Sequence, residues 1–515
     1  KKIIKKAVKK GLNAKKLDAL LHQPKTSAGT KKPSREQLSS LFEHYRSGRF
    51  NSAETLAKAL IHDFPQHIFA WELLGAMLHQ IGRAQDSLVY LQMCAQLAPR
   101  KPEAHSNLAL AYASLGNLDA AKVSYTKAIA LEPDDPEMHC NFGNTLQRMR
   151  KTDEAISSYI EAIRLKPDFA DAYLNLSVLY EKNNKIELAL SVLKKAKEKV
   201  SDREQDFLLS EALISFRNGD FENSGNLIKK INLDDLGEER KRVFMKLRAD
   251  WLDNRKDFCA AFNAYKLFNN HVKNTGEYKN HNADEYFECQ RKKAFQLRHL
   301  QETSPYISNL ETSWLHPTFL IGFPRSGTTL LDTILRTHSK VEVSEEIPIT
   351  IKMNRKLGSL TDIALIEDID EAAAKIASNF YIEELEKHIT LNKDCIAIDK
   401  LPLNILELPL INRIFPKAKF ILALRHPFDC VLSCWMQDFK LNPAMSNMTD
   451  LDRITDFYAT TMEILLLCEE RYSLNIQKIR YEDMVIDFKK NVSNVLEFLS
   501  LDWEEKLVTY QNTAY

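Results

Sequence analysis

Several features that define other classes of protein are missing from this sequence of 515 residues. It has no run of 18 or more apolar residues, so we expect no transmembrane helix. Its eight cysteines are scattered without paired CxxC motifs, which argues against a zinc site and against a disulfide framework. We therefore predict a cytoplasmic protein in a reducing compartment, although a preceding targeting segment stays open because the chain begins at Lys1 rather than Met.

The net charge of +1 hides an uneven distribution. Residues 1–35 carry twelve Lys and Arg side chains and a single acidic residue, Asp18. We interpret residues 1–33 as a basic N-terminal arm that keeps the chain in solution. Weak contact of this arm with an anionic surface is the alternative. We expect no nucleic-acid partner, and the sequence does not specify an oligomeric state.

From residue 34 onward the sequence repeats with a period of 34 residues, as its prolines show: Pro65, Pro99, Pro133 and Pro167. This period, with small residues at fixed positions, predicts two antiparallel helices per unit that approach closely. The pattern resembles the tetratricopeptide repeat. We predict an all-α superhelical array over residues 34–270 and a helical linker over 271–312.

The histidines of the array are expected to serve packing rather than to bind a metal. His105 and His139 occupy the repeat position that Trp71 and Tyr173 occupy in neighbouring units. An array of this kind commonly holds peptides on its concave face, and a protein or peptide acceptor is the partner we expect.

From Ser313 strands and helices alternate, which predicts an α/β domain over residues 313–515, with a parallel sheet flanked by helices. The four predicted strands are Thr318–Gly322, Cys395–Asp399, Lys419–Arg425 and Ile476–Arg480. Ligands of such sheets bind at the carboxyl ends of the strands. The polar motifs of this sequence lie at those ends.

The main motif follows the first predicted strand and reads GFPRSGTT, from Gly322 to Thr329. Its spacing is P-loop-like, but Thr328 stands where a nucleotide-triphosphate loop has lysine, and the cation is Arg325. The N–H groups of such a loop and of the following helix bind anions. We therefore predict a phosphate group held by Arg325, Ser326, Gly327, Thr328 and Thr329.

A second anion site is predicted at Arg425, which ends the third strand, and Ser433, two helical turns later. A guanidinium fork and a hydroxyl suit a second phosphate. Two separate phosphate sites on one nucleotide favour 3′-phosphoadenosine 5′-phosphosulfate (PAPS) over ATP.

Residues 313–515 resemble the PAPS-dependent sulfotransferases, most closely the tyrosylprotein sulfotransferases and their bacterial repeat-linked members. The resemblance rests on the loop GFPRSGTT, the segment LRHPFDCVLSCW, the pair Glu345-Glu346 and the strand-end Lys400. Members usually continue with a segment that covers the 3′-phosphoadenosine. The resemblance therefore implies that the domain is incomplete at its C-terminal end.

The resemblance also implies roles for single residues. Glu346 would be the general base, with Glu345 as its rival, and Lys400 and Arg325 would stabilise the leaving group. Tyr481 would contact the nucleotide, and no metal would take part. We further expect Asp399 to orient Lys400.

These features predict transfer of a sulfuryl group from PAPS to an acceptor hydroxyl. A protein or peptide tyrosine is favoured, and a carbohydrate acceptor stays open. A nucleotide kinase or NTPase that uses the same loop is one alternative, although the missing loop lysine argues against it. A non-catalytic repeat adaptor is the other.

Overall fold

The structure is a computed structural model that describes residues 32–300, 316–392 and 394–512. The chain divides into two compact units, residues 1–247 and 248–515. No helix within the described ranges is long and apolar enough to cross a membrane. Residues 1–31 of the basic arm lie outside the described residues, so its role stays a prediction.

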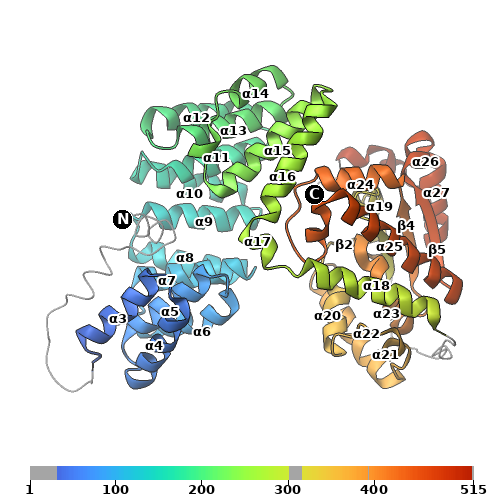
Figure 1. Cartoon of the computed structure of the whole chain (residues 1–515), viewed down its shortest axis with the longest axis horizontal. Coiled ribbons are helices and arrows are strands. Elements are labelled where there is room, and N and C mark those ends of the chain that lie inside the picture. The colour runs from blue at the N-terminus through green and yellow to red at the C-terminus, as the bar shows by residue number, and fades with distance from the viewer. Residues whose placement is uncertain (1–31, 301–315, 393, 513–515) are drawn as a thin grey trace. The chain divides into compact units, whose positions relative to one another are not determined.

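The first unit is a succession of helical hairpins (Figure 1). The hairpins are α3 (Arg35–Arg46) with α4 (Phe50–Asp63), α5 (Ile68–Gln80) with α6 (Ala84–Leu97), α7 (Pro102–Ser114) with α8 (Leu118–Leu131), α9 (Pro136–Arg148) with α10 (Thr152–Leu165), α11 (Ala170–Lys182) with α12 (Ile186–Lys199), and α13 (Glu204–Arg217) with α14 (Phe221–Ile228). A 3₁₀ turn, η1 (Leu233–Asp235), leads to α15 (Glu238–Asn254). The predicted all-α repeat array is confirmed.

Small residues bring the two helices of a hairpin together, as predicted. A Cβ atom added at Gly75 would lie 2.7 Å from the Leu91 side chain. At Gly143 it would lie 2.6 Å from the ring of Tyr159. Real Cβ atoms do not approach other atoms so closely, so a larger residue at either position would force the helices apart.

One hydrogen bond recurs at the start of four successive hairpins. A side-chain donor binds the carbonyl oxygen of the proline six residues earlier in the chain. The donors and their distances are Trp71 Nε1 (2.9 Å), His105 Nε2 (2.9 Å), His139 Nε2 (2.8 Å) and Tyr173 OH (3.1 Å). The two histidines therefore hold the backbone at the start of their hairpins through a hydrogen bond, in addition to the packing role that we predicted.

The second unit contains a five-stranded parallel sheet in the order β2-β3-β1-β4-β5. The strands are β1 (Thr318–Gly322), β2 (Val341–Glu345), β3 (Ile396–Lys400), β4 (Lys419–Leu424) and β5 (Asn475–Arg480). The sequence prediction of four strands missed β2. This edge strand has only five residues, and its alternation Val-Glu-Val-Ser-Glu was the available signal.

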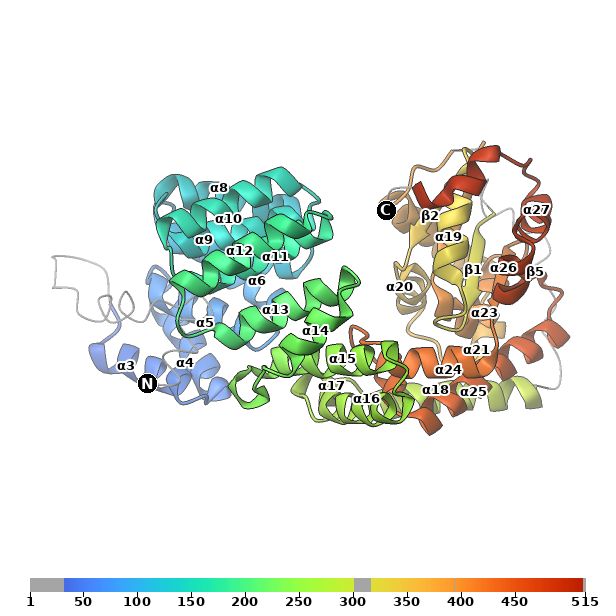
Figure 2. The same ribbon diagram turned by 90° about the horizontal axis from the view of Figure 1, so that it is seen from above.

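Helices cover both faces of this sheet (Figure 2), which confirms the predicted α/β architecture. Phe319 and Ile321 of β1 point into one core, and Leu320 between them points into the other. The helices and 3₁₀ segments are α16 (Phe258–Lys273), α17 (Gly276–Lys279), α18 (Ala283–His299), α19 (Thr328–Arg336), α20 (Ile349–Lys356), α21 (Ile363–Glu367), α22 (Glu371–Glu386), η2 (Pro402–Glu407), α23 (Leu408–Ile414), α24 (Pro427–Met436), η3 (Met445–Thr449), α25 (Leu451–Arg471), α26 (Tyr481–Ile486), α27 (Phe488–Leu499) and η4 (Glu505–Asn512).

The helices that precede β1 pack within the second unit. Asn269 of α16 donates to the carbonyl of Trp435, and Lys273 pairs with Asp450 at 2.9 Å. On α18, the buried ammonium of Lys293 donates to the Leu406 carbonyl at 2.7 Å. The boundary between the two compact units follows Leu247, before the domain boundaries at residues 270 and 312 that the sequence pattern predicts. Those two boundaries stay predictions.

Candidate active site

The loop between β1 and α19 forms a tight turn at the centre of the sheet. Gly327 caps α19 with φ +99°, a left-handed backbone that glycine adopts without strain. A Cβ atom at Gly322 would lie 2.6 Å from the Ser326 hydroxyl and 2.7 Å from the Ala423 carbonyl. These two glycines let the chain turn so that the free N–H groups of α19 face the strand ends, where they can bind an anion.

The loop hydroxyls suit an anion. Ser326 and Thr328 are buried, and the Ser326 oxygen has no hydrogen-bond partner among the described residues. A buried hydroxyl without a partner is costly, so it marks a position where a ligand atom would be stabilising. Thr329 is exposed at the start of the helix.

The second predicted anion site lies beside this loop. The Arg325 Nε donates to the Ser433 hydroxyl at 2.9 Å, so the residues assigned to two separate phosphates touch each other. The Arg425 guanidinium lies 4.9 Å from the centre of the Tyr481 ring and 3.4 Å from the Arg325 carbonyl oxygen. Its Nε is buried without a hydrogen bond. All four residues therefore form one continuous cationic and hydroxyl surface.

Glu482 was not predicted, yet it holds this surface in place. Its carboxylate accepts a hydrogen bond from the backbone N–H of His426 at 2.8 Å. This bond joins the second residue after β5 to the residue that follows Arg425 on the chain. The available signal was its position, one residue after Tyr481 at a strand end.

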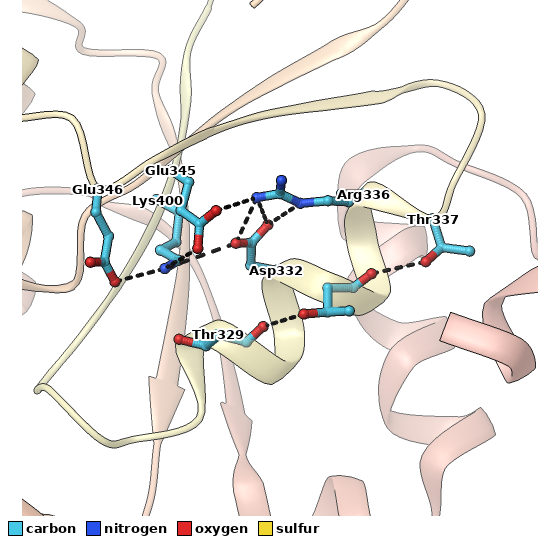
Figure 3. Close-up of polar contacts among 8 residues, drawn as sticks. Thr329, Asp332, Arg336, Thr337, Glu345, Glu346 and Lys400 are labelled. Carbon is cyan, nitrogen blue, oxygen red and sulfur yellow. Dashed lines mark hydrogen bonds and ion pairs between the residues drawn. The ribbon is translucent and has the colours of Figure 1, made fainter. Parts of the chain in front are cut away.

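A charged cluster lies at the carboxyl ends of β2 and β3 (Figure 3). Lys400 is completely buried, and its Nζ lies 2.8 Å from Glu346, 3.4 Å from Glu345 and 3.9 Å from Asp332. Arg336 binds Asp332 at 2.8 Å and Glu345 at 3.3 Å. The buried ammonium is therefore compensated by three carboxylates, as a buried charge must be.

The two adjacent glutamates differ in their surroundings. Glu345 bridges Lys400 and Arg336, and 34% of its side chain is exposed. Glu346 contacts only Lys400 among the described charged groups, and 58% of its side chain is exposed. Its backbone has φ +54°, and its N–H donates to the Lys400 carbonyl at 2.7 Å. The Glu346 side chain thus reaches Lys400 from the edge of the cluster and remains open to solvent (Figure 3).

Asp399 does not orient Lys400 by direct contact, and that expectation is wrong. Adjacent residues of a strand point to opposite faces of the sheet, so the two side chains diverge. The Asp399 carboxylate accepts from Tyr381 OH at 2.7 Å and from the Asn404 amide at 3.4 Å. Burial raises the pKa of Asp399 to about 7.

The predicted site residues thus gather in two groups. One comprises the loop with Arg425, Ser433 and Tyr481, and the other comprises Glu345, Glu346 and Lys400. Asp332 and Arg336 were not predicted, because an i, i+4 ion pair on a helix usually lies on the surface. Among the described residues, no group of three or more His, Cys, Asp or Glu side chains is arranged to hold a metal ion.

Both parts of the chain match known protein families. Residues 317–505 match the sulfotransferase family. Residues 43–102, 102–135 and 151–184 match tetratricopeptide repeats. A tetratricopeptide repeat protein of known structure from Parabacteroides merdae is 16% identical, with a TM-score of 0.41, over 47% of this chain and 93% of that chain.

Curated relatives match about two fifths of the chain. An uncharacterized protein of Aquifex aeolicus is 28% identical over 38% of this chain and 27% of its own length. Protein-tyrosine sulfotransferase 1 of Danio rerio is 26% identical over 41% of this chain and 59% of its own length. The chain thus spans about a quarter of one relative and somewhat more than half of the other. It combines a tetratricopeptide-repeat array with a domain of the sulfotransferase family.

Proposed function

We propose that this protein transfers a sulfuryl group from PAPS to an acceptor hydroxyl, with Glu346 as the general base. One observation carries the proposal: the buried Lys400 ammonium lies 2.8 Å from the solvent-exposed Glu346 carboxylate, at the sheet end that also carries the β1–α19 loop. A cation and a base side by side at an anion site fit group transfer to a hydroxyl.

Each group has a task in this proposal. Glu346 accepts the proton of the acceptor hydroxyl. Lys400 stabilises negative charge that develops on the leaving oxygen, and Arg325 contributes from the loop. Glu345 is held between two cations, whereas Glu346 contacts Lys400 and has the more exposed carboxylate. The geometry therefore favours Glu346 among the two candidates.

The residues present fit PAPS. When bound, PAPS supplies an activated sulfuryl group. Ser326, Gly327, Thr328 and Thr329 would hold its 5′-phosphosulfate through N–H and hydroxyl groups. Arg425 and Ser433 would hold the 3′-phosphate, and Tyr481 would contact the nucleotide. The Ser326 hydroxyl and the Arg425 Nε are buried without a hydrogen bond, so both would gain from such a ligand, although Asp429 lies 3.7 Å from the Arg425 Nε.

A tyrosine of a protein or peptide is the acceptor we propose. Support comes from the name of the Danio rerio relative and from the repeat array, since such arrays commonly bind peptides. The array would recruit the acceptor protein.

The test is transfer of ³⁵S from labelled PAPS to a tyrosine peptide, with the phenylalanine version of the peptide as a blank. We expect Glu346→Gln to lower turnover by about 10²–10⁴-fold, the range for a lost general base. Glu345→Gln should lower it by less than about 10-fold, since that side chain only neutralises charge. Glu342→Gln, exposed on the same strand, is the matched control.

Binding is measured separately by calorimetry with 3′-phosphoadenosine 5′-phosphate. We expect Arg425→Ala to weaken binding by about 10–100-fold, as for the loss of a charge-assisted hydrogen bond. Mg²⁺-dependent ATP turnover without any binding of the adenosine bisphosphate would contradict the proposal. Equal losses of turnover in the Glu345 and Glu346 variants would contradict the assignment of Glu346 as the general base.

A further inference from the structure

Two buried polar side chains link the segments that carry Glu346 and Lys400, and the proposed reaction does not use them. Thr350, in the first turn of α20, donates its hydroxyl hydrogen to the side-chain oxygen of Asn404 in η2 at 2.7 Å. Thr350 is 0% exposed and Asn404 is 1% exposed. A hydrogen bond sealed from water in this way is costly to break, because the remaining partner is left buried without compensation.

This bond has a counterpart four residues earlier on both segments. There the backbone N–H of Glu346 donates to the Lys400 carbonyl at 2.7 Å. Residues 346–350 and 400–404 therefore form a frame that is closed at both ends by a hydrogen bond. The side chains of Glu346 and Lys400, which pair at 2.8 Å, belong to the same end of this frame (Figure 3).

The Asn404 amide is also held from its other side. Its nitrogen donates to one Asp399 carboxylate oxygen at 3.4 Å, which leaves the amide oxygen for Thr350. The other Asp399 oxygen accepts from Tyr381 OH of α22 at 2.7 Å. Both Asp399 and Tyr381 are buried. The frame is therefore anchored in the protein core through a network of satisfied polar groups, which restricts its movement.

The backbone of Glu346 explains why this frame matters. Its φ of +54° lies in the left-handed region, which is unfavourable for a residue other than glycine. Such a conformation persists only where the surrounding structure holds it. The bond to the Lys400 carbonyl holds the turn at Glu346 itself, and the bond from Thr350 to Asn404 holds the segment that leaves the turn. Without the second bond, the turn could relax and carry the carboxylate away from Lys400.

We propose that Thr350 and Asn404 are positioning residues that hold the left-handed turn at Glu346 and so keep its carboxylate beside Lys400. They act through the backbone of the frame and not through charge. The inference rests on the proposed function, in which Glu346 is the general base and Lys400 stabilises the leaving oxygen.

The first measurement is hydrogen–deuterium exchange of the full chain without donor or acceptor, read by mass spectrometry from peptides that cover residues 344–350. Thr350→Val keeps the shape of the side chain but removes the hydroxyl donor. We expect the backbone N–H groups of this segment to exchange about 10-fold faster in that variant. Asn404→Leu removes the acceptor and should have the same effect, whereas Thr350→Ser keeps the hydroxyl and should stay within about 3-fold of the unchanged protein.

Thr461 of α25 provides a matched control for the loss of a buried threonine hydroxyl. It is also 0% exposed, and its hydroxyl donates to the Phe457 carbonyl at 2.7 Å within a single helix. Thr461→Val should leave the exchange of residues 344–350 unchanged. Comparison of the two valine variants therefore separates a specific effect on the Glu346 turn from a general loss of stability.

The second measurement is the ³⁵S transfer assay. We expect Thr350→Val to lower kcat by about 10–100-fold, because displacing a reacting group by about 1 Å can cost that much. Thr350→Ser should restore kcat to within about 3-fold of the unchanged protein, and Thr461→Val should leave it unchanged. The dissociation constant of 3′-phosphoadenosine 5′-phosphate should change by less than about 3-fold in all three variants, since the β1–α19 loop is left intact.

Several results would overturn the inference. One is unchanged exchange of residues 344–350 in both Thr350→Val and Asn404→Leu. Another is faster exchange with unchanged kcat in an active protein, and a third is an equal loss of kcat in Thr461→Val. If Thr350→Val fails to fold, Asn404→Leu takes its place with the same expected results.

The two proposals fail differently. If the exchange of residues 344–350 responds as expected in a protein that transfers no sulfuryl group, the frame still holds the turn and the proposed function falls. If transfer depends on Glu346 but neither exchange nor kcat responds to the Thr350 and Asn404 variants, the proposed function stands and the positioning role falls.

Discussion

In the repeat array, side chains of three residue types make the same hydrogen bond, whereas at the strand ends of the second unit each contact occurs once. Trp71, His105, His139 and Tyr173 all bind a proline carbonyl, so the position accepts more than one kind of donor. Lys400 has no such counterpart among the described residues. The comparison indicates that single changes in the array should be mild and those at the cluster severe.

The largest effect should come from removing the Lys400 ammonium. Lys400→Met leaves Asp332 and Glu345 with one cation, Arg336, in a buried setting. We expect a loss of about 3–5 kcal/mol in the free energy of unfolding, as for a broken buried ion pair. Turnover should fall by at least about 10²-fold because a group that stabilises developing charge is lost. Urea denaturation and the ³⁵S assay measure the two quantities.

A lysine of an ordinary surface pair provides the control for Lys400. Lys478 of β5 pairs with Glu469 at 2.7 Å and is 48% exposed. Lys478→Met should change stability by less than about 0.5 kcal/mol, because exposed ion pairs contribute little. If both lysine variants were equally stable, the cluster would not depend on its buried cation.

Sequence reasoning predicts structure best where a pattern repeats or a motif is contiguous. The period of 34 residues predicts the hairpins, which the structure confirms. The loop that begins at Gly322 predicts an anion site, which stays a prediction. Glu345 meets Lys400 only through the register of β2 beside β3, and β2 was too short to predict. The burial of Lys400 and the roles of Asp332 and Arg336 depend on that register, so no local pattern indicated them.

A second effect concerns a buried group that titrates near neutral pH. The pKa of Asp399 is raised by burial to about 7, so the folded state holds its proton more tightly than the unfolded state does. Stability contributed by the protonated form is present below about pH 4 and is lost as pH rises to about 7. Asp399→Asn cannot ionise. The free energy of unfolding of this variant, relative to that of the unchanged protein, should therefore rise by on the order of 2–4 kcal/mol between pH 4 and pH 8.

The measurement for Asp399 is urea denaturation of both proteins at several pH values between 4 and 8. Tyr381→Phe is a useful companion, since it removes a donor to the carboxylate and should make the pH dependence steeper. A difference between Asp399→Asn and the unchanged protein that stays constant with pH would contradict the raised pKa.

A smaller effect on stability is expected at the recurring hydrogen bond between a side chain and a proline carbonyl in the array. His105→Phe keeps the ring but removes the hydrogen bond to the Pro99 carbonyl, and it should cost about 1 kcal/mol. His105→Tyr supplies a hydroxyl donor as Tyr173 does, so its cost should stay below about 0.5 kcal/mol. Thermal unfolding of the three proteins compares them. If both variants cost the same, the shared role would be packing alone.

The smallest effect should be a gain in stability from a substitution at the turn between the two helices of a hairpin. This turn has a left-handed residue in each of the six hairpins: Gly48 and Gly82 with φ of 73° and 85°, Gly116 with 82°, Arg150 with 59°, Asn184 with 57° and Gly219 with 81°. Arginine has a side-chain clash in this conformation that glycine avoids. Arg150→Gly should therefore raise stability by about 0.5–1 kcal/mol, after the greater freedom of glycine in the unfolded chain is taken into account.

The reverse change at the preceding turn tests the same cause with the opposite sign. A Cβ atom at Gly116 would meet nothing within 4 Å, so a side chain there finds space but not a favourable backbone. Gly116→Arg should therefore lower stability by about as much as Arg150→Gly raises it, and the double variant should be close to neutral. Because the turns are equivalent, the two effects should add; a strong deviation would mean that Arg150 makes contacts that the repeat pattern does not describe.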